Sequence, residues 1–400
     1  MSDATVRSPC RLSAPGVVCS LGDDPRHLIA ALREGRRGLT TSDTFTPGRR
    51  LPLGRVTVPL PADEAWPAAH RSRNNRLLAR ALERLGPSLE AVLARHPRER
   101  IGVVLGSSTS GIGETEQALA VAGRDGPLPE DFHYARQELG APARFIAERL
   151  GLAGPVHILS TACSSSAQAL ASARRLLLAG ECDAVIAGGA DSLCRLTVNG
   201  FASLEAVSDA PSLPFSANRA GINLGEAAAL FLVTREPGGI QLLGAGESSD
   251  AYHVSAPRPD GSGARAAMAA ALDQAGCAPE AVDYLNLHGT GTGTGHNDAM
   301  EARAVSELFA TPPACSSTKA LTGHTLGAAG ALEAAFCWLA LHHGFLPRHV
   351  HDGVDDPELP RLPLVNTPEG APRVALSNSF AFGGNNVSLL LARDAPEDGP

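Results

Sequence analysis

Short runs of valine, isoleucine and leucine alternate along this chain with longer, alanine-rich stretches of helical periodicity. Runs of the first kind are typical of buried strands, and the longer stretches are typical of helices. This alternation predicts an α/β fold. The expected strands cover residues 101–105, 156–160, 184–187, 228–233, 284–287, 374–377 and 387–391. The expected helices cover residues 25–33, 75–85, 144–150, 164–179, 263–274, 298–308 and 328–342.

The length and charge of the chain narrow its class. Its 400 residues are enough for two domains or one large duplicated domain. A cluster of turn-forming residues at 236–239 could join two similar halves, so we expect one half over 1–236 and another over 237–400. The net charge of −8 gives no bias toward nucleic acid or an anionic membrane. No apolar run is long enough for a membrane span, and no secretory signal opens the chain, so we expect a cytoplasmic protein.

Cysteine and lysine usage point to a few special positions. The chain has eight cysteines and no C-x-x-C pair, so we expect neither a zinc ribbon nor a redox dithiol motif. Most of these cysteines should be buried thiols, and at least one could act chemically. Lys319 is the only lysine among 34 basic residues. Either it survived by chance, or its site needs a compact ammonium that arginine cannot replace.

Cys163 lies between the expected strand 156–160 and the expected helix 164–179, in the segment Ser160-Thr161-Ala162-Cys163-Ser164. The N-terminus of a helix stabilises a thiolate, and small neighbours let a substrate approach closely. Taken alone, the segment is equally consistent with a buried structural cysteine. It does not match G-x-S-x-G, so an α/β-hydrolase is not supported.

His288 follows the expected strand 284–287 and opens a run of alternating glycine and threonine. This run matches neither of the glycine-rich phosphate-binding patterns. Its glycines leave His288 room to face a ligand. A metal site is a less favoured interpretation, because the spacing of its candidate ligands fits no zinc motif known to us. Those candidates are His288, His296, Asp298 and Glu301.

Two further segments place reactive or bulky side chains among glycines. One holds Lys319 and His324 before a helix start rich in glycine and alanine, and the other holds Phe380 and Phe382 before a glycine pair. The second segment could form a hinge or a gate. One cysteine and two histidines in such turns suggest a thiol nucleophile with imidazole partners.

Together these motifs resemble those of the β-ketoacyl-acyl carrier protein synthases, the decarboxylating condensing enzymes of the thiolase superfamily. The resemblance covers nearly the whole chain, in segments 16–22, 161–163, 288–292, 319–324 and 378–384. It implies a thiolase-like fold of two similar α/β halves in a five-layered αβαβα arrangement. A true thiolase would need a second cysteine near its C-terminal glycine motif, and none follows Cys337. A Cys-His-Asn condensing enzyme would have asparagine in place of His324.

The resemblance also implies the catalytic roles. Cys163 would accept the acyl chain as a thioester, and the backbone N–H groups of Cys163 and Phe382 would form the oxyanion hole. His288 and His324 would stabilise the enolate that remains when the malonyl group loses carbon dioxide. Phe382 would also gate the site between the two half-reactions.

The remaining roles concern electrostatics and substrate binding. Lys319 would set the electrostatics of the site, paired with Glu301 at the family's partner-acid position. Thr290 and Thr292 would bind the phosphopantetheine arm, and Thr109 would shape the acyl tunnel. Phe380 is a further expected substrate-binding residue. No bound cofactor and no metal are implied, because the substrates are carried on acyl carrier protein.

The chain departs from the family pattern at three places. The segment between His288 and Glu301 is longer than usual and lacks the usual proline, which puts the pairing of Lys319 with Glu301 in doubt. Ala381 stands where glycine is commoner, which could stiffen the gating loop. Ala220 stands where aspartate is usual.

Three stretches are most similar to the ketosynthases of aryl polyene pigment clusters, at residues 72–76, 191–198 and 214–219. General fatty-acid elongation would need the same catalytic residues, so both pathways stay open. The implied partners are acyl carrier protein and a second subunit, as a homodimer or as a heterodimer with a related chain. Basic residues at 70–76, with Arg80 and Arg84, could bind the acidic carrier, or could form a solvated helix face.

A different class of function is also possible. Chain-length-factor subunits keep this fold and pair with an active synthase without catalysing the reaction. They typically lose the nucleophile, whereas this chain retains Cys163, His288, His324 and Lys319. An active condensing enzyme is therefore the favoured interpretation.

Overall fold

The computed structural model describes residues 10–293 and 297–394. Its α-helices are α1 Pro25–Glu34, α2 Arg73–Arg95, α3 Ile112–Ala122, α4 Ala141–Leu150, α5 Ser165–Ala179, α6 Arg195–Ser203, α7 Ser262–Ala275, α8 Asn297–Leu308, α9 Lys319–Thr322 and α10 Ala329–His343. Its strands are β1 Cys10–Leu12, β2 Gly16–Val18, β3 Thr40–Ser42, β4 Leu51–Leu53, β5 Ile101–Gly106, β6 Val156–Leu159, β7 Ala184–Asp191, β8 Ala227–Thr234, β9 Ile240–Ser249, β10 Tyr284–Asn286, β11 Ala314–Ser316, β12 Val374–Phe380 and β13 Asn385–Ala392.

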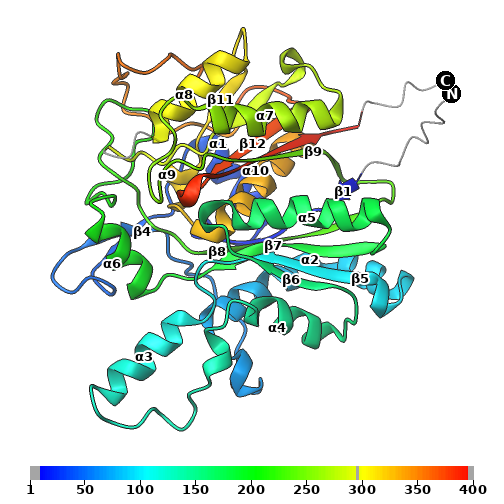
Figure 1. Ribbon diagram of the computed structural model, residues 1–400, viewed down its shortest axis with the longest axis vertical. Coiled ribbons are helices and arrows are strands. Elements are labelled where there is room, and N and C mark those ends of the chain that lie inside the picture. The colour runs from blue at the N-terminus through cyan, green and yellow to red at the C-terminus, as the bar shows by residue number, and fades with distance from the viewer. Residues whose placement is uncertain (1–9, 294–296, 395–400) are drawn as a thin grey trace.

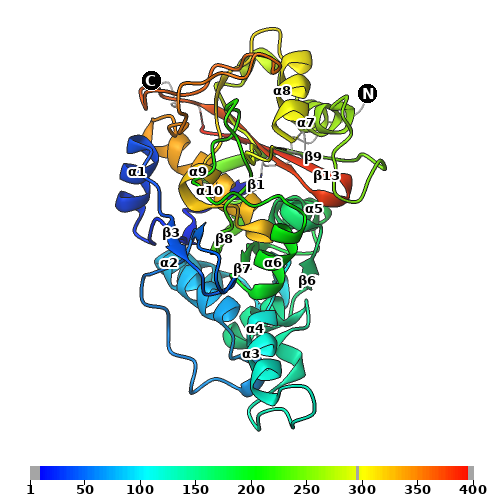
Figure 2. The same ribbon diagram turned by 90° about the vertical axis from the view of Figure 1, so that its left-hand side faces the viewer.

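Strands β3 and β4 form a separate two-stranded sheet, and the other described strands form two leaves that are joined through β1. One leaf has the order β8-β7-β5-β6, with β2 also paired to β8, and the other has the order β9-β13-β12-β10-β11. Strand β1 pairs with β8 on one side and with β9 on the other. Helices α5 and α10 lie between the leaves, α2 and α4 cover the outer face of the first leaf, and α7 and α8 cover that of the second. Figures 1 and 2 show these layers, which give the predicted αβαβα arrangement.

Burial on both faces explains the apolar strand sequences. Along β7, Val185 contacts the core between the two leaves, whereas Ile186 contacts the core under α2 and α4. Neighbouring residues of a strand point to opposite faces, so a strand in the middle of this sandwich needs apolar residues at every position. Among the described residues, no helix combines the length and the apolar character that a membrane crossing requires.

The predicted elements are all present, with differences at their edges and in their number. Helix α2 was expected to end at Leu85, but it resumes after a kink at Gly86, which has φ 48° and precedes Pro87. Strand β6 was expected to be buried, but it is the edge strand of its leaf, and Val156 is 37% exposed. Strand β9 was not expected, because Gly244 and Gly246 interrupt its apolar pattern. Both glycines face α7, where a Cβ atom would lie about 2 Å from a backbone oxygen.

The predicted turn at 236–239 connects β8 to β9, with positive φ at Gly238 and Gly239. It therefore lies where the chain passes from one leaf to the other. The division into halves at residue 236 stays a prediction.

Candidate active site

Cys163 lies in η4 (Ala162–Ser164), a single turn of 3-10 helix between the end of β6 and the start of α5. Ala162 has φ 52°, a left-handed conformation that is unfavourable for a residue with a Cβ atom. The sharp turn places Cys163 at the N-terminal end of α5, where it is 5% exposed. Strain next to a reactive side chain is typical of functional sites.

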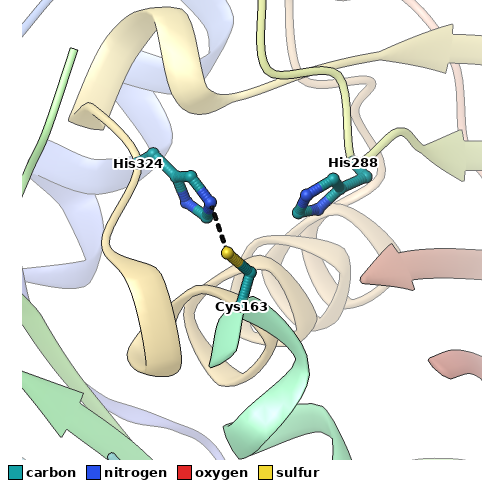
Figure 3. A group of neighbouring side chains, drawn as sticks. All are labelled: Cys163, His288 and His324. Atoms are coloured by element: carbon teal, nitrogen blue, oxygen red, sulfur yellow. Dashed lines mark hydrogen bonds between the residues drawn. The ribbon is translucent and has the colours of Figure 1, made fainter. Parts of the chain in front are cut away.

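His324 and His288 face Cys163 from the other half of the chain (Figure 3). The His324 Nε2 atom lies 3.0 Å from Cys163 Sγ, and the two imidazole rings are edge to face with centroids 5.5 Å apart. His288 follows β10 and His324 follows α9, so turns at the ends of different elements bring the three residues together. The backbone N–H of Phe382 also donates to the Cys163 sulfur.

Lys319 holds His288 in one tautomer. Its ammonium donates to the His288 carbonyl at 2.6 Å and to the His288 Nδ1 atom at 3.3 Å. An ammonium has no lone pair to offer, so Nδ1 must be the acceptor and the ring proton must be on Nε2. His288 therefore presents a fixed N–H donor on the nitrogen that Lys319 does not contact.

The predicted pairing of Lys319 with Glu301 is wrong. The third donor of Lys319 pairs with Glu333 of α10, and both side chains are buried. Glu301 instead accepts from the backbone N–H groups of His288 and Gly289, both at 2.8 Å, and from Asn378 Nδ2 at 3.0 Å. Three neutral donors hydrogen-bond this side chain, so it holds the turn that carries His288, and Lys319 acts on it only through its charge, which lowers the pKa of Glu301 against the rise that burial causes.

Glu333 is the site residue that the sequence prediction missed, although the sequence contains a signal for it. Helix α10 is buried on all sides from Ala329 to Leu341, and Glu333 is the only charged residue in that stretch. A charge in a fully buried helix needs a partner of opposite sign. Lys319, the only lysine, is that partner.

Burial keeps the reacting groups neutral. It raises the pKa of the Cys163 thiol to about 12, against the opposing effect of Lys319. It also lowers the pKa of His288 and of His324 well below the usual range, and Lys319 adds to both shifts. The expected thiolate at a helix N-terminus is therefore absent at rest. The thiol can lose its proton to the neutral His324 imidazole that it contacts.

Two cavities meet at Cys163, and both are bordered by Phe201 and Phe382, whose ring centroids are 5.5 Å apart. One cavity retains about 10 Å³ of free volume and is lined by both histidines and by the predicted binding residues Thr290, Thr292 and Phe380. The other has about 290 Å³ and is lined by Ser108, Ser160, Ala162, Thr197 and Leu326 as well. The two phenylalanines thus lie between a narrow cavity, which contains both imidazoles and both threonines, and a wider one.

The structure does not bring Thr109 to either cavity. Its hydroxyl and its backbone N–H both donate to Asp191 Oδ1 at 2.9 Å, and its neighbour Ser108 lines the wider cavity instead. The prediction for Thr109 was therefore one residue away from the cavity wall.

The alternative metal site is not formed by the described residues. Asp298 accepts backbone N–H groups from Phe215, Thr290 and Gly291, and Glu301 is engaged as described above. His296 lies outside the described residues. The three ligand atoms of Cys163, His288 and His324 do lie within 4.8 Å of one another, which is close enough to bind an ion.

The basic segment expected to bind a carrier protein is used within the chain. Arg73 pairs with the buried Glu226, and Arg80 and Arg84 both pair with Asp23. Arg71 and Arg76 donate to backbone carbonyls of residues 60–66. Glu226 and Asp23 balance part of this positive charge, whereas the carbonyl contacts leave the charges of Arg71 and Arg76 in place. Carrier binding by this segment stays a prediction.

The other departures from the family pattern have simple outcomes. Ala381 has φ −100°, a conformation open to any residue, so the backbone does not require glycine there. Ala220 is exposed, and nothing in the structure explains the loss of aspartate. The longer segment after His288 includes residues 294–296, which lie outside the described part of the chain.

Comparisons with known proteins agree with this geometry. Residues 75–237 match the N-terminal domain of the β-ketoacyl synthase family, and residues 240–352 match its C-terminal domain. The chain belongs to the β-ketoacyl synthase family. It is 35% identical over 319 residues to the mitochondrial 3-oxoacyl-[acyl-carrier-protein] synthase of Arabidopsis thaliana, covering 74% of this chain and 69% of that protein.

Two further relatives are similar over larger shares of their length. The chain is 37% identical over 317 residues to 3-oxoacyl-[acyl-carrier-protein] synthase 2 of Rhizobium meliloti, covering 73% of this chain and 74% of that protein. It also matches a chain of the solved complex of the ketosynthase ApeO with its chain length factor ApeC from Xenorhabdus doucetiae. That match has 45% identity and a TM-score of 0.92, and covers 98% of this chain and 100% of that one.

Proposed function

We propose that this β-ketoacyl synthase joins an acyl group held on Cys163 to the two-carbon unit of malonyl-acyl carrier protein, with loss of carbon dioxide. One observation carries the proposal: Cys163, His288 and His324 converge at the junction of two cavities, with Sγ 3.0 Å from an imidazole nitrogen. The names of the synthases in Arabidopsis and Rhizobium support the same activity.

In the first half-reaction the Cys163 sulfur attacks the carbonyl of an acyl thioester. His324 takes the thiol proton and returns it to the departing carrier thiol, so the acyl group moves to Cys163 without net change in charge. The N–H of Phe382, which already points at the sulfur, and that of Cys163 would stabilise the oxyanion. The raised pKa of Cys163 and the lowered pKa of His324 oppose a resting thiolate, so the proton would move to His324 as the sulfur attacks the carbonyl.

In the second half-reaction malonyl-acyl carrier protein loses carbon dioxide and leaves an enolate. The fixed Nε2–H of His288 would donate to the enolate oxygen. Once Cys163 carries the acyl group, no thiol proton points at His324 Nε2, so the Nε2–H tautomer of His324 can donate to the same oxygen. The enolate carbon then attacks the acyl carbonyl, the carbon–sulfur bond breaks, and the Cys163 thiolate takes up one proton from solvent, which is the proton that the overall condensation consumes. Thr290 and Thr292 would bind the phosphopantetheine arm. The reaction needs no bound cofactor, since the carrier supplies both thioesters.

The same proposal includes a partner. The similar ketosynthase ApeO is in complex with a chain length factor, and here the edge strand β6 leaves its outer side unpaired among the described strands. A groove of about 370 Å³ runs between β6 and α5. We therefore propose a heterodimer with a chain-length-factor-like subunit, in an aryl polyene pathway. The eight free cysteines suit the reducing cytoplasm.

Intact mass spectrometry of wild-type protein and a Cys163→Ala variant tests the activity. After incubation with acyl and malonyl carrier-protein thioesters, we expect an acyl adduct and a β-ketoacyl product only with the wild type. Polyene and saturated acyl donors, compared at equal concentration, distinguish the two pathways. If neither adduct nor product forms, alone or with a candidate partner subunit, the chain is a non-catalytic subunit instead.

A further inference from the structure

Asp191 is a buried acid that the proposed mechanism does not use. It is the last residue of β7 and is 0% exposed. Its Oδ1 atom accepts from Ser107 Oγ and Ser108 N, both at 2.8 Å, and from the N–H and hydroxyl of Thr109, both at 2.9 Å. Its Oδ2 atom accepts from Gly327 N at 2.6 Å. No ion pair among the described residues includes it.

These donors belong to two turns from different halves of the chain. Ser107–Thr109 follow β5, whereas Gly327 lies in η6 (Leu326–Ala328), the 3-10 turn before α10. Ser108 and Leu326 both line the wider cavity beside Cys163. The Ser108 hydroxyl also reaches the carbonyl of Ala162, next to the nucleophile, at 3.4 Å. One carboxylate thus connects two walls of that cavity.

The turns are in close contact at this carboxylate. A Cβ atom on Gly327 would lie 2.7 Å from Asp191 Oδ2 and 2.9 Å from Ser108 N. Burial raises the pKa of this carboxyl, and the hydrogen bonds from Ser107, Ser108 and Thr109 oppose that rise. Each carboxylate oxygen also receives a backbone N–H, which favours the ionised form. The negative charge is therefore held by neutral donors alone.

We propose that Asp191 is a positioning residue, which holds the Ser107–Thr109 turn against the Leu326–Ala328 turn and so sets the width of the wider cavity beside Cys163, where the acyl group would lie. The part that concerns the acyl group rests on the proposed function. The part that concerns the thiol does not, because the carboxylate acts on Cys163 in the absence of substrate.

The negative charge of Asp191 acts on the Cys163 thiol, so the reactivity of that thiol gives a second measurement. Asp191 and Glu333 raise the pKa of Cys163, Lys319 and the Phe382 N–H lower it, and the neutral rings of His288 and His324 face the sulfur. Asp191 also raises the pKa of Cys194, which is buried beside it. Replacing Asp191 with a neutral residue should therefore ease ionisation of Cys163.

The test compares Asp191→Asn with wild type in three assays. The new amide would point a donor at one of the N–H groups that the carboxylate now accepts. We expect acyl transfer to Cys163 to slow about tenfold, because a shift of the cavity wall would move the acyl carbonyl away from the sulfur. Decarboxylation of malonyl-acyl carrier protein in the absence of an acyl donor should change less than about twofold, since it uses the narrower cavity. Alkylation of Cys163 by iodoacetamide at pH 8 should quicken about threefold or more.

Two variants separate positioning from folding. Thr109→Val removes one hydroxyl donor without changing charge, so it should slow acyl transfer and leave the alkylation profile unchanged, and Thr109→Ser should restore the transfer. Glu226→Gln is the matched control, because Glu226 is a buried carboxylate whose partners Val56 N, Leu193 N and Arg73 line neither cavity. It should alter neither readout of the thiol.

Two outcomes would overturn the proposal. Acyl transfer and alkylation at wild-type rates in Asp191→Asn would show that the carboxylate positions nothing. Equal losses of acyl transfer and decarboxylation, with an unchanged alkylation profile, would show a general structural role. Failure of the proposed function is separate: the wild type would form no acyl adduct, while the alkylation comparison could still be made.

Discussion

Helices α5 and α10 begin with turns of the same shape, but only one turn carries a nucleophile. Ala162 and Leu326 open these turns with φ 52° and 51°, and each turn leads into a helix of 15 residues. Cys163 in the first turn corresponds to Gly327 in the second. The first faces a cavity and an imidazole, whereas the second is closed by Asp191. A shared backbone turn therefore does not by itself make a reactive site; its surroundings do.

The two helices differ in the same way. Glu333 occupies the place in α10 that Ala169 occupies in α5, and both residues are buried. Helix α10 thus contributes the Glu333 carboxylate that pairs with Lys319, and helix α5 follows the turn that carries the Cys163 thiol. Ala331 N donates to Ser166 Oγ at 2.9 Å, so the two helix starts are held directly against each other. The duplicated scaffold divides one active site between its halves.

Exchanging Cys163 and Gly327 is the strongest test of the comparison between the two turns. The double variant Cys163→Gly with Gly327→Cys moves the thiol from the first turn to the second, where its Cβ atom would meet Asp191 and Ser108. We expect no acyl adduct and a loss of condensation of at least about 10³-fold, because the new thiol would have no imidazole partner and no cavity. Intact mass and peptide mapping measure this. An adduct at position 327 would show that the turn alone is sufficient.

Making α10 resemble α5 tests the buried ion pair. Glu333→Ala leaves the Lys319 ammonium buried without its anion, and we expect the free energy of unfolding to fall by about 3–5 kcal/mol. Adding Lys319→Met should recover much of that stability while condensation stays low, since His288 would lose the donor that fixes its tautomer. Urea unfolding and product formation measure the two effects. Full activity in the double variant would contradict the role assigned to Lys319.

Alanine substitutions at Gly327 and Cys163 compare how tightly the two turns are packed. Gly327→Ala forces a Cβ atom against Asp191 and Ser108, and should lower the free energy of unfolding by about 1–3 kcal/mol. Cys163→Ala removes one small buried group and should cost about 1 kcal/mol. Urea unfolding of both variants under one condition checks the order. Equal stabilities would mean that the contact at Gly327 relaxes without cost.

The pH dependence of alkylation tests the protonation state of Cys163. Its pKa is raised to about 12, so the thiol is protonated at neutral pH and its ionised fraction grows as pH rises toward that value. Reaction with iodoacetamide should therefore quicken about tenfold per pH unit between pH 7 and 10, with no plateau near the usual thiol pKa of about 8.5. Mass spectrometry of the Cys163 peptide gives the rate, with Cys277 as a less buried comparison. A plateau below pH 9 would show that the helix N-terminus outweighs burial.

The sequence alone determined the α/β class and the family, and it predicted the four residues Cys163, His288, His324 and Lys319 that the structure brings together. Strand periodicity and local motifs are short-range properties, so they can be recognised without knowing how the elements pack. Phe382, Thr290 and Thr292 could be recognised for the same reason, because each lies within a short continuous motif.

Only the tertiary structure decided which charges meet. Glu333 instead of Glu301 pairs with Lys319, Asp191 instead of the cavity engages Thr109, and Asp23 and Glu226 take up the arginines of the expected basic patch. Each of these contacts joins elements that are distant in sequence. A buried charge is stabilised by whichever opposite charge or donor the packing of the layers brings within about 3 Å, and sequence spacing does not encode that distance.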